Sequence, residues 1–225
     1  MKQRNRFILL AIGLFFLTTG ITLSIRSGLG TSAVSAIPYV FSETSGWGLG
    51  LSNFCFFVVL AMAQMLILGR PDRRVLAQVP FGMLFSLFIT LTGKLFDFSL
   101  PEVYPLRLAV LLASLVFTAL GIYFYMEANL VLNAPEGFQR TVTKWLDKPF
   151  HRVKILLDCL FVLCAAGIGL LAEQKVIGVR EGTLLSALLV GRFIGWIPAG
   201  VKEKARRFCA GPAADRAKGA GAAAD

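Results

Sequence analysis

Six apolar runs, each close to the length that crosses a lipid bilayer, dominate this sequence. They cover residues 7–25, 51–69, 75–93, 106–126, 155–172 and 182–201. A transmembrane helix needs about 20 consecutive apolar residues, so this series excludes an ordinary soluble domain. Only 16% of the 225 residues are charged, against about 25% in average globular chains. We therefore predict an all-α, polytopic membrane protein with six transmembrane helices.

The first run also has features of a secretory signal. Three basic residues precede it, and Ala33-Val34-Ser35-Ala36 follows it. The run over 7–25 is longer than a usual signal core, and further apolar runs follow. We therefore predict that it stays in the protein as an uncleaved first helix.

The positions of the basic residues predict the orientation in the membrane. If the N-terminus lies inside, the inner segments hold 17 Lys and Arg and the outer segments hold five, with Arg192 inside the last run. Cytoplasmic loops carry such an excess of Lys and Arg, so both termini are predicted to be cytoplasmic. The net charge of +10 is explained by this topology, and no nucleic-acid partner is expected.

The two halves of the chain resemble each other. A shift of about 100 residues aligns similar apolar and glycine positions, and each half reads as long helix, long loop, helix, short loop and helix. Because each half has an odd number of spans, three, the second half is predicted to have the inverted orientation in the membrane. Inverted repeats of this kind are typical of secondary transporters. We predict one transmembrane domain over 1–201, with repeats over about 7–97 and 106–201. Residues 202–225 are predicted to be a mostly disordered cytoplasmic tail.

The long loop of each half predicts a short helix. Residues 27–42 carry one Pro and no charged residue, and Thr31 or Ser32 is a suitable N-cap. In the second half, Asn133 is the predicted cap and Pro135 lies in the first turn of a helix that ends near residue 145. Two interpretations stay open, namely half-helices that enter the bilayer and surface helices on opposite faces.

Several motifs resemble a known family of bacterial membrane proteins. They are NLVLNAPEGF, HRVKILLD, IGVREGTLLSALLVGRFI and the N-terminal GLGTSAVSAIPYVFSETSGWGLG. Over about residues 7–200 the chain resembles YczE/YyaS/YitT-type proteins, in particular the YczE-like branch. The resemblance implies an integral protein of the bacterial cytoplasmic membrane and supplies no substrate. Two departures are Ala134, where the family motif has a Gly, and Thr90, where an Asp is expected.

Two acidic residues inside apolar runs need an explanation, because a carboxylate near the bilayer centre costs at least about 2.5 kcal/mol. Asp158 follows Lys154 by four residues, a spacing that predicts an ion pair on one helix face. The pair has either a packing role or a role in binding a substrate or proton. Glu181, followed by Gly182 and Thr183, either complements a helix N-terminus or belongs to a ligand site.

Other polar residues lie near the ends of the predicted spans. Glu127 and Asn129 end the fourth predicted span, Glu136 begins the short helix that follows, and Arg26 aligns with Glu127 between the halves. These four polar groups line one central cavity if the long loops enter the bilayer, and they face water at the interface otherwise. Arg192 is expected to pair with a carboxylate or to lie in a polar cavity. The complete set of candidate substrate-binding residues is Arg26, Glu127, Asn129, Glu136, Gly137, Lys154, Asp158, Glu181, Gly182, Thr183 and Arg192.

The remaining polar and small residues predict packing. Asn53, Gln64 and Gln78 are expected to form hydrogen bonds between helices. Small residues at Ala187, Gly191 and Gly195 predict close helix packing. One His and four separated Cys give no metal-ligand spacing, no catalytic arrangement is recognisable, and no cofactor is expected.

These patterns favour a secondary transporter of a small polar or anionic solute. Helix N-termini and the basic residues Arg26, Lys154 and Arg192 favour negative groups, and Asp158 or Glu181 is the expected proton-coupling site. The alternative is a non-transporting accessory or sensor protein, with the basic loop over 140–154 as its contact surface. An enzyme is not predicted. Whether the protein forms a homo-oligomer or binds a membrane partner protein stays open.

Overall fold

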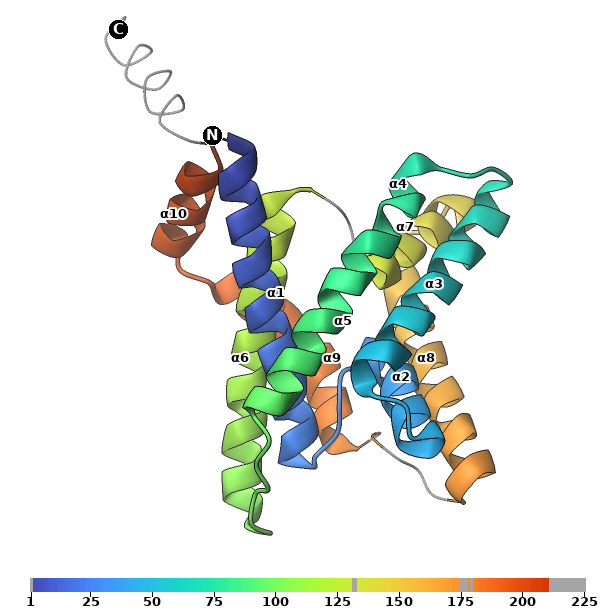
Figure 1. Cartoon of the computed structure of the whole chain (residues 1–225), viewed down its shortest axis with the longest axis vertical. Coiled ribbons are helices and arrows are strands. Elements are labelled where there is room, and N and C mark those ends of the chain that lie inside the picture. Colours follow the sequence, from blue (N-terminus) through green and yellow to red (C-terminus); the bar gives the residue numbers. More distant parts are fainter. Residues whose placement is uncertain (1, 131–132, 175–177, 179, 211–225) are drawn as a thin grey trace, which may run out of the picture.

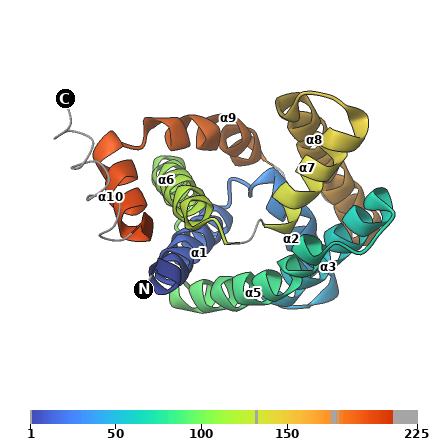
Figure 2. The ribbon, with the colours of Figure 1, turned by 90° about the horizontal axis from the view of Figure 1, so that it is seen from above.

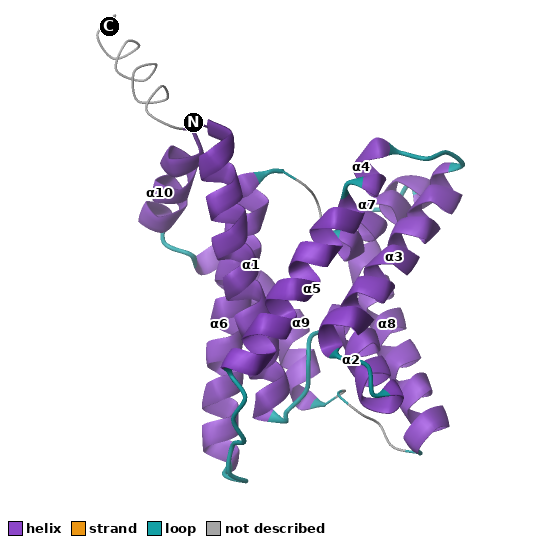
Figure 3. Ribbon diagram, in the orientation of Figure 1, coloured by secondary structure: helices purple, strands orange, loops and turns teal. Residues whose placement is uncertain are grey.

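The structure, a computed structural model, describes residues 2–130, 133–174, 178 and 180–210. Every regular element in these ranges is an α-helix, as predicted, and none is a strand (Figure 3). The helices are α1 (Lys2–Ser27), α2 (Ala33–Ser45), α3 (Leu49–Leu68), α4 (Arg73–Leu76), α5 (Gln78–Leu95), α6 (Tyr104–Ala128), α7 (Ala134–Leu146), α8 (Phe150–Glu173), α9 (Glu181–Trp196) and α10 (Ala199–Ala210).

Five stretches of the described chain are long and apolar enough to cross a membrane. They are Gln3–Ser27, Leu49–Leu68, Arg73–Leu95, Tyr104–Ala128 and Arg152–Ala172, and they match five of the six predicted spans. Large apolar side chains lie on the outer surface of these helices, for example Leu66 at 83% exposure and Leu171 at 90%. A bilayer is the environment in which such a surface is stable.

The sixth predicted span is shorter than expected. The prediction covered 182–201, but α9 ends at Trp196 and has 16 residues, so it is not among the helices that meet the criteria for a span. Sixteen residues rise about 24 Å, less than the roughly 30 Å of a hydrocarbon core. The helix stops because Pro198 disfavours helical backbone at Ile197, which is extended at φ −53° and ψ 124°. Six spans are therefore not confirmed.

The chain continues after Pro198 as α10, a helix that we did not predict. It packs against α1 and α6, and the Asn5 side chain donates to the Phe208 carbonyl at 2.9 Å. The predicted tail over 202–225 is thus helical up to Ala210. Residues 211–225, and with them most of the predicted disorder, lie outside the described residues.

The most extensive contact between two helices of the described chain joins α1 and α6, which lie side by side in both views (Figures 1 and 2). Glycines make this approach feasible. A Cβ atom at Gly121 would lie 2.6 Å from the Cα atom of Leu17, and one at Gly20 would lie 2.6 Å from the Thr118 nitrogen. Small residues let membrane helices approach backbone to backbone, so these positions determine the distance between α1 and α6.

The helices form two groups. The first group is α1, α6, α9 and α10, the second is α2, α3, α7 and α8, and α5 packs against both. Figure 2 shows α5 running between them, and α5 packs against α1 of the first group and α3 of the second. Gln64 on α3 and Gln78 on α5 exchange two hydrogen bonds, of 2.8 and 3.1 Å, which confirms the predicted interhelical pairing.

Two short helices of 13 residues each, α2 and α7, begin near the middle of the molecule and diverge (Figure 1). The sequence predicted both. Ser32 is the N-cap of α2, and its hydroxyl accepts from the Ser35 N–H at 3.3 Å. Asn133 holds the N-cap position of α7, although its side chain makes no capping hydrogen bond.

The segment that leads into α2 is joined to the start of α9. The N–H of Gly182 donates to the Leu29 carbonyl at 2.8 Å, and the N–H of Thr31 donates to the Gly178 carbonyl at 3.1 Å. The Arg180 guanidinium adds a bond to the Gly28 carbonyl at 3.0 Å. Residues 28–31 are thereby held to Gly178, Arg180 and Gly182, which lie about 150 residues further along the chain.

We predict that Gly121→Ala lowers the melting temperature of the detergent-solubilised protein by several degrees. The added methyl group overlaps the α1 backbone, and overpacking of this kind costs about 1–3 kcal/mol. Gly93→Ala is the control, because no atom lies within 4 Å of the added Cβ there. Equal melting temperatures for the two variants would contradict close packing of α1 on α6.

Candidate functional site

A cavity of about 300 Å³ lies between the two helix groups. Side chains of α1, α6 and α9 line it from the first group, and side chains of α2, α3, α7 and α8 line it from the second. Phe85 of α5 lines it as well. Apolar residues such as Phe57, Phe85 and Ile122 form much of the wall. Ligand sites for small molecules have this composition, an apolar wall with a few polar groups that fix the orientation of the ligand.

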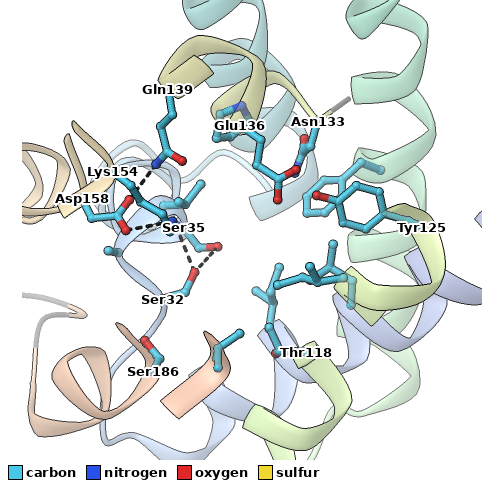
Figure 4. A pocket seen from close by; sticks show the side chains of 18 of the residues that line it. Ser32, Ser35, Thr118, Tyr125, Asn133, Glu136, Gln139, Lys154, Asp158 and Ser186 are labelled. Atoms are coloured by element: carbon cyan, nitrogen blue, oxygen red, sulfur yellow. Dashed lines mark hydrogen bonds and ion pairs between the residues drawn. The ribbon is translucent and has the colours of Figure 1, made fainter. Parts of the chain in front are cut away.

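Four buried polar side-chain atoms of residues that line this cavity lack a hydrogen-bond partner among the described residues. The atoms are the Tyr125 hydroxyl, Asn133 Oδ1, Glu136 Oε2 and Gln139 Oε1. Figure 4 shows Asn133 and Glu136 directed toward the space in front of the Tyr125 ring. Buried polar groups are nearly always paired in folded proteins, so four unpaired groups at one cavity indicate a place for a ligand.

Glu136 is a carboxyl in the first turn of α7, directed into the protein. Burial raises the pKa of this carboxyl above its ordinary value near 4.5, while the neighbouring Tyr125 hydroxyl, Lys154 and Arg140 act in the opposite direction. The Tyr125 hydroxyl lies close enough to act on the carboxyl, yet no hydrogen bond of normal geometry joins the two groups. Glu136 therefore retains an oxygen that is available to another group in the cavity.

Lys154 and Asp158 form the predicted ion pair on α8, with 3.0 Å between Nζ and Oδ2. The Gln139 amide holds the same carboxylate, because its Nε2 donates to Asp158 Oδ1 at 2.8 Å. The Asp158 side chain is 16% exposed and that of Lys154 is 45% exposed. Asp158 is thus satisfied by two partners from α7 and α8, in contrast to Glu136.

The opposite wall of the cavity is the beginning of α2. Ser32, Ala33, Val34 and Ser35 line the cavity there, and the first N–H groups of a helix have no partner within the helix. Ser32 and Ser35 satisfy each other, with their hydroxyls 2.9 Å apart. The first turn of α2 and the side-chain oxygens at the start of α7 therefore line the same cavity.

The structure brings three predicted site residues, Glu136, Lys154 and Asp158, to this cavity. Gly137 lies behind it, where a Cβ atom would be 2.9 Å from Gln64 Oε1. Gly137 allows α7 to pack against α3 and α5, and thereby positions Glu136.

Other predicted site residues do not line the cavity. Arg26 forms an ion pair with Asp97 at the far end of α1. Glu127 accepts a 3.3 Å bond from the Tyr123 hydroxyl, and Asn129 is the left-handed C-cap of α6 at φ 47°. Of the four polar groups expected together in a central cavity, only Glu136 lies there.

The three predicted residues at the start of α9 have structural contacts. Glu181 is exposed, and the backbone that approaches Gly182 closely is that of Leu29. The buried Thr183 hydroxyl accepts from the Arg180 N–H at 3.3 Å and caps the helix. These residues position α9, whose Ser186, Val190 and Ile194 reach the cavity further along.

Arg192 departs from the expectation of a carboxylate partner or a polar cavity. Its side chain is exposed, and it takes part in none of the ion pairs among the described residues. Arg192 lies on α9 between the cavity-lining residues Val190 and Ile194, on a different face of the helix. Close helix packing was predicted at Ala187, Gly191 and Gly195, and the packing around these three positions lies outside the described part of the structure.

Sequence reasoning missed Tyr125 and Gln139 as site residues, and it assigned Asn133 only as a cap. Asn53 was expected to bond to another helix, but its amide donates to the Leu49 carbonyl of its own helix at 2.9 Å and lines the cavity. One signal for Gln139 was available, because residues three apart on a helix share a face and Gln139 follows Glu136 by three.

The described residues contain no group of three or more His, Cys, Asp and Glu side chains placed to hold a metal ion. A family model of unknown function, DUF6198, matches residues 4–199. The chain belongs to this family. The match covers all of the candidate site and both short helices. Comparisons with curated proteins and with solved structures give no match. The resemblance to YczE/YyaS/YitT-type proteins stays a prediction.

We predict that Glu136 makes the stability of the protein depend on pH. Because its pKa is higher in the folded protein than in the unfolded chain, its contribution is fully present below the ordinary pKa and is lost as the pH rises through the raised value. The melting temperature of the wild type, relative to Glu136→Gln, should therefore fall as the pH rises above the ordinary carboxyl value near 4.5.

The comparison with Glu136→Gln isolates this carboxyl, because the surrounding Tyr125, Arg140, Lys154 and Asp158 are present in both proteins. The control is Glu43→Gln, which removes an exposed carboxylate of α2 and should leave the pH profile of the wild type unchanged. Parallel profiles for the wild type and Glu136→Gln would show that Glu136 is not buried as described.

Proposed function

We propose that this protein is a secondary transporter that carries a small polar solute across the membrane by way of the cavity between the two helix groups. The observation that carries the proposal is the position of the cavity at the start of both short helices, where four buried polar atoms lack partners. Transporter sites lie near the bilayer midplane, where interrupted helices expose their N-termini.

The arrangement of the helices supports two inverted repeats. The helix order of the first half, α1, α2, α3 and α5, matches α6, α7, α8 and α9 of the second. Two sets of contacts correspond too, since α2 packs against α8 as α7 packs against α3, and α1 packs against α5 as α6 packs against α9. The packing of α3 on α5 has no comparable counterpart between α8 and α9 among the described residues. Alternating access in such folds is largely the movement of one group of helices against another around a fixed site.

An anionic solute has less support than the sequence suggested. Two of the three basic residues that favoured it, Arg26 and Arg192, do not line the cavity. Of the two expected proton-coupling residues, Glu181 is exposed outside the cavity, and Asp158 lies within it. We retain Asp158 as a candidate for coupling and place Glu136 beside it.

We further propose that the protein resides in a bacterial cytoplasmic membrane with both termini inside, that it is not an enzyme and that it needs no cofactor. The orientation rests on the 17 to five distribution of Lys and Arg between the two sides. The bilayer and a small solute are the proposed partners.

A non-transporting accessory or sensor protein is the second candidate. The observation in its favour is an exposed basic surface formed by Arg140, Lys144, Lys148 and Arg152, next to Trp145 at 67% exposure. Arg and Trp are enriched in protein interfaces, so this surface suits a partner at the end of α7 and the start of α8.

Access to the cavity from both sides of the membrane tests transport without knowledge of the solute. In a variant with the four native Cys replaced by Ser, we predict that Val190→Cys reacts with a membrane-impermeant maleimide in both right-side-out and inside-out vesicles. Val190 lines the cavity, and a transporter opens its cavity to each side in turn.

The control for vesicle sidedness is Trp47→Cys, in an exposed position between α2 and α3, which should react from one side only. Reaction of Val190→Cys from a single side, in vesicles where Trp47→Cys reports the correct orientation, would contradict transport through this cavity.

Substitutions in the basic surface test the second candidate, an accessory protein that binds a partner. If the protein is an accessory subunit, replacing Lys144, Lys148 and Arg152 by Gln should abolish copurification of its partner and leave access to Val190→Cys unchanged, since none of the three lines the cavity. If it is a transporter, the same replacement should leave access from both sides intact, and no partner should be required in proteoliposomes.

A further inference from the structure

The unpaired atoms of the cavity share one chemical property, which is the capacity to accept hydrogen bonds. Three are carbonyl or carboxyl oxygens, on Asn133, Glu136 and Gln139, and the fourth is the Tyr125 hydroxyl, which accepts as well as donates. The side chains of Tyr125, Asn133 and Gln139 are at least nine-tenths buried, with exposures of 1%, 8% and 0%. A ligand that satisfies this cluster has to bring several hydrogen-bond donors.

The charges around the cluster favour a cation. The positive charge of Lys154 is matched by Asp158 at 3.0 Å. Arg140 lines the rim of the cavity and is exposed, so solvent screens its charge. Glu136 Oε2 is buried without a hydrogen-bond partner, and Glu136 forms none of the direct ion pairs found among the described residues, although Lys154 and Arg140 act on it from a greater distance.

The size and wall of the cavity favour an organic ion over a bare metal ion. A volume of about 300 Å³ holds a small molecule, and the wall next to the cluster includes the rings of Phe57, Phe85 and Tyr125. Aromatic faces attract cations, and they also provide apolar contact for a carbon skeleton. An ammonium group on a small apolar body fits both parts of this site.

Resting on the proposed transport function, we propose that the solute is a small organic ammonium ion. Its N–H groups, three in a primary ammonium ion, donate to oxygens of this cluster that include Glu136 Oε2, and the carboxylate of Glu136 balances its charge. This assignment replaces the anionic solute suggested by the sequence. In this proposal Glu136 binds the ammonium ion when its carboxylate is ionised, and it carries a proton when the ammonium ion is absent.

The experiment compares three probes that share a phenylethyl body and differ in their polar group. Phenethylammonium, 2-phenylethanol and 3-phenylpropanoate are added to the purified full-length protein, and the melting temperature and binding isotherm are measured. We expect stabilisation by phenethylammonium alone, because a ligand that binds only the native state raises the melting temperature. Sodium chloride replaces the ammonium salt in a fourth sample.

Binding to substituted proteins tests whether the ammonium group lies in the cavity. Glu136→Gln, of nearly the same shape, should weaken binding of phenethylammonium by about tenfold or more, because it removes a buried charge partner. Tyr125→Phe keeps the ring and should weaken binding by a smaller factor, so it tests the site even if Glu136→Gln folds poorly. Glu43→Gln, which removes an exposed carboxylate outside the cavity, should bind as the wild type does.

Each contrary result overturns the inference. Stabilisation by 3-phenylpropanoate instead of phenethylammonium would show that the cavity takes anions. An equal shift with sodium chloride would show that an inorganic cation suffices, and equal binding to Glu136→Gln and Tyr125→Phe would place the ammonium group elsewhere. If no probe binds while Val190→Cys reacts from both sides, the ammonium solute is wrong and transport stands; if Val190→Cys reacts from one side only, transport itself fails.

Discussion

The contact between α1 and α6 is the constraint on which the rest of the structure depends. Gly20 and Gly121 bring the two backbones together, and both helices present residues to the cavity, among them Leu17 and Tyr125. Each of these long helices also supports one more helix of its own half, α5 on α1 and α9 on α6. The first helix group therefore forms one wall against which the second group closes the cavity.

The parts of the fold that local chemistry determines were predictable from the sequence. Helix length followed from the apolar runs, the two short helices followed from Ser32, Asn133 and Pro135, and the four-residue spacing of Lys154 and Asp158 gave their ion pair. Pro198 carried the signal for the early end of α9, but the apolar residues around it concealed the break. Local pattern gave no indication of α10, since its packing on α1 and α6 is a long-range contact.

The site was predictable only where charge marked it. Glu136, Lys154 and Asp158 were found because ionisable residues near apolar runs need an explanation, whereas Tyr125 and Gln139 carry no charge and resemble ordinary helix residues. The same criterion selected Arg26 and Arg192, which are at least partly exposed to solvent in the structure. Residue type gives the cost of burying a group, and only the three-dimensional packing shows whether the group is buried.

The hydrogen bonds that residues 28–31 form with Gly178, Arg180 and Gly182 have a mechanical consequence. They fasten the entrance of α2, whose first turn lines the cavity, to the beginning of α9, which belongs to the other helix group. A backbone hydrogen bond contributes about 0.5–1.5 kcal/mol net, so the bonds from Thr31 and Gly182 act as a weak latch between the groups. Separation of α2 from α9 has to break this latch, whereas a movement that leaves it closed carries both helices together.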